Sequence, residues 1–343
     1  MPDLNAYLKD PDAIDDLDDL YNPQRRDRQA RRGRRPRGVS KSRRTKRQRA
    51  AVKVAGLAAS EGDFATTYTP SRYEEGWLLE SLQPFYEMGL LADVLAVIKG
   101  GKEATVYRCQ GHPDSGLGLV AAKVYRPRMF RNLRRDHVYR QGRDILTPEG
   151  RPVGLKGDRI AHAIQKKTAF GQKAAHTSWL MHEYTTLQTL HAAGAAVPAA
   201  YGAAANAILM SYVGDEDAPA PTLHEVTLEP DEVEPLFDEV LHHIELMLGH
   251  GIIHGDLSAY NILYWAGEIT LIDFPQVVDP RRNHEAYAIL GRDIARVCEY
   301  FAGYGLSRDP ADMLERLWRR YIGATPAERD ADDARLSWSP EEE

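Results

Sequence analysis

The stretch HGDLSAYNILYWAGEITLIDFPQ, residues 254–276, reads as an apolar hairpin whose ends carry polar side chains. Its two β-rich runs, NILYW and EITLID, are joined by Ala266 and Gly267, which suit a two-residue turn. With that turn, Asn261 and Asp273 emerge at the same open end of the hairpin. The pattern therefore predicts a small polar site at the end of a buried two-stranded element.

The side chains at this end are oxygen donors that suit Mg²⁺, namely the amide of Asn261 and the carboxylate of Asp273. Asp256 lies on the loop that enters the same end, where a carboxylate can orient a nucleophilic hydroxyl and accept its proton. Any one of these residues alone is more typical of a turn cap. Together, D-x-x-x-x-N, a hairpin and a second Asp have the spacing of a phosphotransfer site in kinase-like folds.

Phosphoryl transfer also needs positive charge at the phosphates, and Lys123 in AAKVY is the candidate, although an isolated lysine is more often solvent-facing. Glu183, in the helical pattern SWLMHEY, is a candidate partner that could hold the ammonium against the phosphates. Upstream lies IKGGKEATVY, with Gly100, Gly101 and Lys102. It lacks a full G-x-G-x-x-G, and a plain β-turn would explain it equally well.

The composition, with 43% hydrophobic and 27% charged residues, is that of a soluble protein. No run of about 18 apolar residues is present, which argues against a membrane span. The N-terminus is acidic and lacks the apolar segment of a secretory signal. Cys109 and Cys298 have no metal-ligand spacing, so we expect a buried, reduced pair and a cytoplasmic protein.

The net charge of −6 conceals a basic arm, residues 25–49, which holds fourteen Lys or Arg residues and a single acid, Asp27. Such an arm could neutralise several phosphates in a salt-dependent and largely sequence-independent way. The alternative is a solvated tail that folds back on the protein's own acidic regions. Ser40 and Ser42 within the arm are candidate autophosphorylation sites.

The pattern along the chain predicts two lobes, because strand-like runs dominate up to about residue 213 and helix-like patterns dominate after it. A helix-like pattern over residues 73–94 is expected to be interrupted near Pro84. The predicted parts are a disordered acidic and then basic arm (1–50), an N-terminal lobe with preceding helices (70–213) that contains a long insert (126–178), a helical C-terminal lobe (214–324) and an acidic tail (325–343).

The segments GGKEATVY, AAKVYR, ILMSYVG followed by APAPTL, HGDLSAYNIL and LIDFPQ occur in the order found in RIO-type atypical serine/threonine protein kinases. From Tyr73 to Gly323 the chain resembles this family, above all its first branch and bacterial relatives. The resemblance implies an α+β, two-lobed protein-kinase-like fold that binds ATP and Mg²⁺. It would combine a small antiparallel β-sheet lobe with a reduced α-helical lobe.

Carried over by position, the resemblance gives the candidate residues their roles. Asp256 would be the proton acceptor, and Asn261 and Asp273 would hold Mg²⁺. Asp273 could also receive the phosphoryl group itself, which would make the protein an ATPase-like switch. The residues expected to bind the nucleotide are Lys102, Val106, Lys123, Glu183, Met210, Ser211 and Val213, with Ser211 and Val213 supplying hinge backbone contacts to adenine.

The chain departs from the family pattern beside the second aspartate. Phe274 and Pro275 stand where the first branch usually has Val-Ser or similar, and a proline there removes a backbone donor and fixes φ. RIO proteins lack the usual peptide-substrate platform, and here no Ala-Pro-Glu follows Asp273.

These features predict a RIO-type serine/threonine protein kinase or ATPase that acts on a protein substrate, which can be the chain itself. The family's association with small-subunit maturation makes RNA or a ribosomal particle the expected partner of the basic arm. Two alternatives remain open. One is a small-molecule kinase of the aminoglycoside phosphotransferase type, which shares the Asp/Asn/Asp triad, and the other is a nucleotide-gated RNA-binding module without catalysis.

Overall fold

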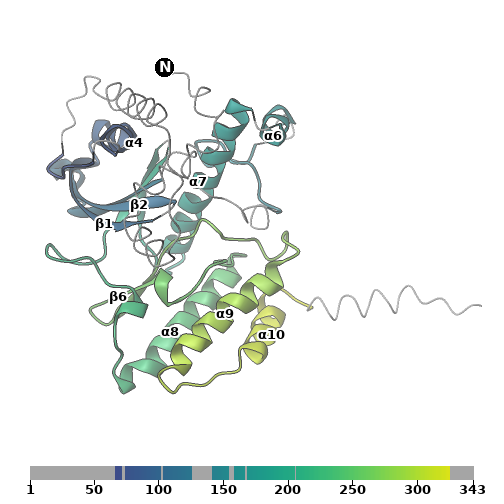
Figure 1. Cartoon of the computed structure of the whole chain (residues 1–343). Helices are drawn as coiled ribbons and strands as arrows, with labels where there is room; N and C mark the ends of the chain where they lie inside the picture. Colours follow the sequence, from purple (N-terminus) through teal and green to yellow (C-terminus); the bar gives the residue numbers. More distant parts are fainter. Residues whose placement is uncertain are drawn as a thin grey trace, which may run out of the picture. The chain divides into compact units, whose positions relative to one another are not determined.

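The computed structural model describes residues 66–71, 74–101, 103–125, 141–153, 158–166, 168–204 and 206–324 (Figure 1). They form two compact units. The first comprises the described residues up to 125 with 204 and 206–209, and the second comprises the described residues 141–203 and 210–324. The predicted basic arm, with Ser40 and Ser42, the acidic tail and Lys102 lie outside the described residues.

Strands dominate the first unit. Its elements are α4 (Glu75–Glu87), β1 (Leu91–Gly100), β2 (Ala104–Gly111), the short 3₁₀ helix η2 (Pro113–Ser115) and β3 (Leu119–Tyr125). β2 pairs antiparallel with both β1 and β3. The five-stranded sheet has the order β1-β2-β3-β5-β4, with β4 at Ala200–Ala204 and β5 at Ala207–Ser211. Every β3 residue after Leu119 is buried, which fits a central strand covered on both faces.

The predicted interruption near Pro84 is wrong, because Pro84 lies inside the single helix α4. The proline removes one helical hydrogen bond, and burial of an apolar face that includes Phe85 outweighs that loss. The helix ends two residues before Gly89, which has a φ of 66°. Leu91 then begins β1 instead of continuing the helix.

Helices dominate the second unit, which also holds one small hairpin. Its elements are α6 (Asp158–Gln165), α7 (Ala169–Ala192), η5 (Leu223–Glu225), α8 (Pro230–Gly249), η6 (Ala259–Asn261), β6 (Ile262–Trp265), β7 (Glu268–Leu271), α9 (Ala286–Ala302) and α10 (Pro310–Tyr321). α8 and α9 lie side by side in Figure 1, and the rings of Phe237 and Phe301 meet edge to face between them at 5.4 Å. α10 packs on the same bundle, where Trp318 contacts Tyr287 at 5.1 Å.

Part of the predicted insert is helical. α6 and the first residues of α7 fall within residues 126–178, and α7 groups with the second unit. Residues 126–140 lie outside the described ranges. No helix in the described ranges is both long and apolar enough to cross a bilayer.

The hairpin β6–β7 has the register that the sequence predicts. Trp265 lies opposite Glu268 across the turn, and at the other end the Ile272 N–H donates to the Asn261 carbonyl at 3.0 Å. The turn residues Ala266 and Gly267 both have positive φ, 53° and 88°, as a type I′ turn requires.

The turn between β6 and β7 holds Ala266 in a strained backbone conformation that a substitution can relieve. Ala266 occupies the left-handed region, which costs a residue with a Cβ about 1 kcal/mol, whereas asparagine tolerates it better. We expect Ala266→Asn to raise the free energy of unfolding by about 0.5–1 kcal/mol in urea denaturation. Gly267→Ala should lower it by about 1 kcal/mol. An Ala266→Asn protein no more stable than wild type would contradict the turn assignment.

Candidate active site

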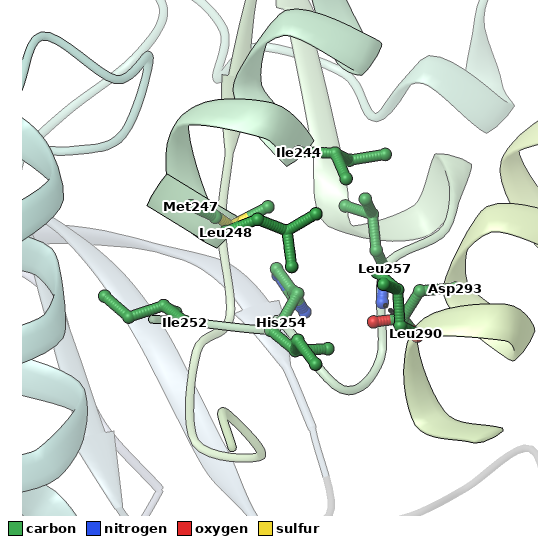
Figure 2. A pocket seen from close by; sticks show the side chains of 9 residues that line it. Ile244, Met247, Leu248, Ile252, His254, Leu257, Leu290 and Asp293 are labelled. Carbon is green, nitrogen blue, oxygen red and sulfur yellow. Dashed lines mark hydrogen bonds between the residues drawn. The ribbon is translucent and has the colours of Figure 1, made fainter. Parts of the chain in front are cut away.

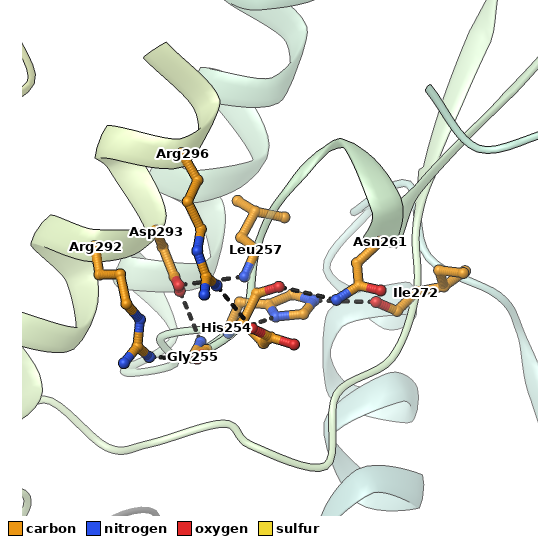
Figure 3. Close-up of polar contacts among 9 residues, drawn as sticks. His254, Gly255, Leu257, Asn261, Ile272, Arg292, Asp293 and Arg296 are labelled. Atoms are coloured by element: carbon orange, nitrogen blue, oxygen red, sulfur yellow. Dashed lines mark hydrogen bonds and ion pairs between the residues drawn. The ribbon is translucent and has the colours of Figure 1, made fainter. Parts of the chain in front are cut away.

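Three of the predicted residues gather at the open end of the β6–β7 hairpin, within the second unit, where Figure 3 shows Asn261 beside Ile272. The Asn261 Nδ2 donates to the backbone carbonyl of Asp256 at 2.9 Å, which ties the loop 254–257 to the start of the hairpin. Asp273 follows directly after Ile272, whose N–H is bonded to Asn261. The structure thus brings Asp256, Asn261 and the backbone of Asp273 together as the sequence predicts.

The carboxylate of Asp256 is held by an arginine that the sequence analysis did not single out. Nη1 of Arg296, on α9, lies 2.7 Å from Oδ1 of Asp256. The two side chains are 38% and 37% exposed, so the pair is open to solvent and to a ligand. Figure 3 shows Arg296 reaching from its helix to the loop.

Asp293, also on α9, anchors the backbone of the same loop. Its side chain is 2% exposed, and its two oxygens accept the N–H groups of Gly255 at 2.7 Å and Leu257 at 3.2 Å. Burial raises the pKa of Asp293 to about 7, although the two N–H donors and the nearby arginines Arg292 and Arg296 favour the charged form. The bonded N–H groups flank Asp256, so Asp293 fixes the backbone on both sides of it.

His254 joins the loop to Ile272, the residue directly after β7. Its Nδ1 accepts the N–H of Asp256 at 3.3 Å, so the ring proton is on Nε2, which donates to the Ile272 carbonyl at 3.1 Å. The imidazole also lies 4.6 Å from the ring of Phe274, which is fully buried. His254 therefore serves as a structural bridge between Asp256 and the segment that carries Asp273.

The backbone at Asp273 is strained. Its φ of 72° lies in the left-handed region, which a residue with a Cβ adopts only when its surroundings impose it. Arg143 is one such constraint, because its Nη2 donates to the Pro275 carbonyl at 2.9 Å and its Nε donates to the Val277 carbonyl at 3.0 Å. Pro275 cannot donate, and its carbonyl instead anchors the segment.

A small cavity lies behind the loop (Figure 2). It has room for roughly one water molecule. His254 and Asp293 are the polar residues among its lining, and the others are the apolar Ile244, Met247, Leu248, Ile252, Ile253, Leu257 and Leu290. A space this small and apolar cannot hold a nucleotide, so the candidate site is the open face that Asp256 and Arg296 share.

Within the described residues, no group of three or more His, Cys, Asp or Glu side chains is arranged to hold a metal ion. The donors at the hairpin end are one carboxylate, Asp273, and one amide, Asn261. This all-oxygen pair fits Mg²⁺, which usually takes one or two protein oxygens and completes its shell with phosphates and water. The Asn261 Nδ2 donates to the backbone carbonyl of Asp256, so the amide oxygen of Asn261 is the atom that would bind a ligand.

The first unit contains two of the predicted nucleotide-binding residues, Val106 and Lys123, and they are directly opposite each other on β2 and β3. Lys123 is 8% exposed, and its Nζ lies 5.4 Å from the centre of the Tyr125 ring. A buried ammonium needs a negative partner, either a carboxylate or a phosphate.

In the second unit Glu183 is buried on α7 at 1% exposed and likewise requires a partner for its charge. Its pairing with Lys123, which belongs to the other unit, stays a prediction.

The predicted hinge residues carry defined backbone bonds. The Ser211 N–H donates to the Ala199 carbonyl at 2.9 Å, and Ala220 donates to the Val213 carbonyl at 3.0 Å. The side chain of Met210, just before them, is buried. Ser211 and Val213 therefore keep their main chain fixed by neighbours within the second unit.

Four residues of the site belong to none of the sequence motifs, namely Arg143, Arg292, Asp293 and Arg296. For Asp293 a signal was present, because it occupies a position on the apolar face of α9 between Leu290 and Ile294. A charged residue on a buried helical stripe indicates a specific polar partner. Arg143 gave no such signal, because the residues that it binds lie more than 130 positions away.

The loop, the hairpin and their oxygen donors have the arrangement expected of a phosphotransfer site in a kinase-like fold. A model of the RIO domain matches residues 155–313, which include this site. The RIO-type serine/threonine-protein kinase Rio1 of Thermoplasma acidophilum is 34% identical over 143 residues, covering 41% of this chain and 73% of that protein.

Two further curated relatives are similar over longer segments. Rio1 of Haloferax volcanii is 30% identical over 218 residues, 64% of this chain and 66% of that protein. The serine/threonine-protein kinase RIO1 of Chaetomium thermophilum is 30% identical over 229 residues, and the chain spans 41% of its length. The chain belongs to the RIO family of protein kinases.

A substitution at Gly255 tests how firmly the backbone of the loop 254–257 is held in place. A Cβ at this position would overlap the carbonyl oxygen of Gln276, and its φ is 85°. We expect Gly255→Ala to lower the free energy of unfolding by at least about 2 kcal/mol in urea denaturation. Gly251 is the matched control, since it has a φ of 69° but no atom within 4 Å of the point that a Cβ would occupy, and Gly251→Ala should cost only about 1 kcal/mol. Equal losses of stability in the two variants would show that the loop can shift to accommodate a Cβ at position 255.

The raised pKa of Asp293 predicts that the free energy of unfolding depends on pH. Because its folded pKa of about 7 lies above the ordinary value of 3.8, folding takes up a proton between these two pH values. This contribution to stability is present at low pH and is lost as the pH rises through 7. Relative to Asp293→Asn, which has no carboxyl to titrate, wild-type stability should fall from pH 4 to pH 8 by up to about 4 kcal/mol. Urea denaturation of both proteins at several pH values measures this, and a pH-independent difference would contradict it.

Proposed function

We propose that this RIO-family protein transfers the γ-phosphoryl group of ATP, with Mg²⁺, to a serine or threonine hydroxyl of a protein, including its own chain. One observation supports this most directly. The loop 254–257 presents the carboxylate of Asp256 while Asn261 binds that residue's backbone, and Asp273 emerges beside them at the same hairpin end.

In this proposal Asp256 accepts the proton of the hydroxyl as it attacks, and Asn261 and Asp273 hold Mg²⁺ through their oxygens. The bound ion would neutralise charge on the phosphates. His254 and Asp293 do not react. They hold the loop so that the Asp256 side chain faces the acceptor.

We assign ATP binding to the residues that the family resemblance gives. Lys123 would supply positive charge to the phosphates, and Glu183 would take the supporting role that the resemblance gives it. Val106 and Met210 would offer apolar contact to the base, and Lys102 is a further candidate. At the hinge, the Ser211 N–H and the Val213 carbonyl already have partners. We assign the adenine contacts to the other main-chain groups of Ser211 and Val213, as the family resemblance implies.

A second acceptor is Asp273. Its carboxylate could attack the γ-phosphorus, forming an acyl phosphate and releasing ADP, and water would then hydrolyse the acyl phosphate to complete an ATPase cycle. The left-handed backbone of Asp273 favours this route, because strain of this kind is found where a side chain is aimed at a reacting group.

The partner that we propose for the basic arm 25–49 is RNA within a ribosomal particle, on the basis of its fourteen Lys or Arg residues. Cytoplasmic localisation is supported by Cys109 and Cys298, which are free and buried, as expected in a reducing compartment. Autophosphorylation would make the chain a phosphoprotein, with Ser40 and Ser42 as candidate positions.

Asp256→Asn tests the proton acceptor. It should lower transfer to hydroxyls by about 100-fold or more, because the amide cannot take up the proton, while ATP binding stays near that of wild type. The measurement combines γ-labelled ATP with titration of nucleotide binding. Asp238→Asn, an exposed acid on α8, is the matched control and should behave as wild type. Wild-type turnover by Asp256→Asn would refute the assignment.

The chemistry of the label separates the two acceptors. A serine or threonine ester survives acid, whereas an acyl phosphate at Asp273 is released by hydroxylamine. Absence of both labels from the wild-type protein, together with rapid phosphorylation of an aminoglycoside or amino alcohol, would favour a small-molecule kinase instead.

A further inference from the structure

α9 directs three charged side chains at the loop 254–257, and each of them holds a different part of it (Figure 3). Asp293 accepts two backbone N–H groups, and Arg292 donates to the Gly255 carbonyl at 2.7 Å. Arg296, one turn further along, is the one of the three that binds the side chain of Asp256. The first two contacts fix the backbone, so the loop's path does not require the third.

The Arg296–Asp256 pair is also poorly suited to a purely stabilising role. Both side chains are more than a third exposed, and exposed ion pairs contribute little to folding because water and salt screen them. The chain offers a comparison in Arg308, which is 39% exposed and binds Glu234 of α8, itself 65% exposed, at the same 2.7 Å. Arg296 differs from Arg308 in its partner, because Asp256 is the candidate proton acceptor and Glu234 is not.

The geometry of the pair restricts the carboxylate. Arg296 engages Oδ1 through a planar guanidinium, which limits rotation of the carboxylate and directs Oδ2 to a defined position. A hydroxyl substrate needs one such oxygen, placed within hydrogen-bond reach, to orient it and receive its proton.

We propose that Arg296 is a positioning residue for hydroxyl acceptors, acting through Asp256; this inference rests on the proposed function. In transfer to a hydroxyl, the new O–P bond forms as the bond to ADP breaks, and the hydroxyl proton passes to Asp256. In transfer to Asp273 the attacking oxygen is already a carboxylate, and no proton has to leave. Arg296 therefore controls the first route and leaves the second unaffected.

The test compares Arg296→Gln, Arg296→Lys and the matched control Arg308→Gln with wild type, using γ-labelled ATP and the full chain. For Arg296→Gln we expect acid-stable label to form about 10-fold more slowly, through kcat, with the KM for ATP within about twofold of wild type. In the same variant, the rate at which hydroxylamine-sensitive label forms should stay within about twofold of the wild-type rate. Arg296→Lys keeps a cation within reach but lacks the planar guanidinium, so it should recover only part of the rate, and Arg308→Gln should match wild type.

Several outcomes would overturn the inference. One is an unchanged rate of acid-stable labelling in Arg296→Gln. Others are an equal loss of both labels, a rise in KM without a change in kcat, or a failure of Arg296→Gln to fold while Arg308→Gln folds, each of which would indicate a general structural role. A wild-type protein that forms neither label would overturn the proposed function together with this inference, whereas normal wild-type labelling with no Arg296 effect would overturn the inference alone.

Discussion

The structure of the site depends on one interaction, the acceptance of two loop N–H groups by the buried carboxylate of Asp293. Gly255 and Leu257, the two donors, flank Asp256, so a single side chain from α9 sets the backbone on both sides of the candidate proton acceptor. A buried carboxylate is costly unless it is well bonded, and buried N–H groups are costly when unpaired. The carboxylate and the two N–H groups fulfil one another's hydrogen-bonding requirements, and this favours a single backbone conformation of the loop.

The remaining contacts extend this constraint towards the hairpin. His254 links the Asp256 N–H to the Ile272 carbonyl, and Asn261 binds the Asp256 carbonyl. The loop and both strands of the hairpin are thereby joined by side chains that act on backbone groups. Such a network holds polar atoms in fixed positions without using the carboxylates that are needed for chemistry.

The two aspartates of the site are held in different ways, which suits different roles. Asp256 lies on a bonded loop, with its side chain partly exposed and paired with Arg296. Asp273 has a strained backbone whose following segment is anchored by Arg143 at the Pro275 carbonyl. The Pro275 substitution relative to the family pattern therefore does not leave this segment unsupported, because the anchor uses an acceptor that proline retains.

The sequence by itself determined the hairpin and the identity of its polar ends, because turn chemistry and strand alternation are local properties of residues 254–276. It also determined the family, since the order of the motifs is a linear property. Only the tertiary structure revealed Asp293, Arg296 and Arg143 as partners of the site. These residues act from segments that lie between 36 and 134 positions away from the groups they bind. No local pattern encodes which distant donor meets which acceptor once the chain has packed.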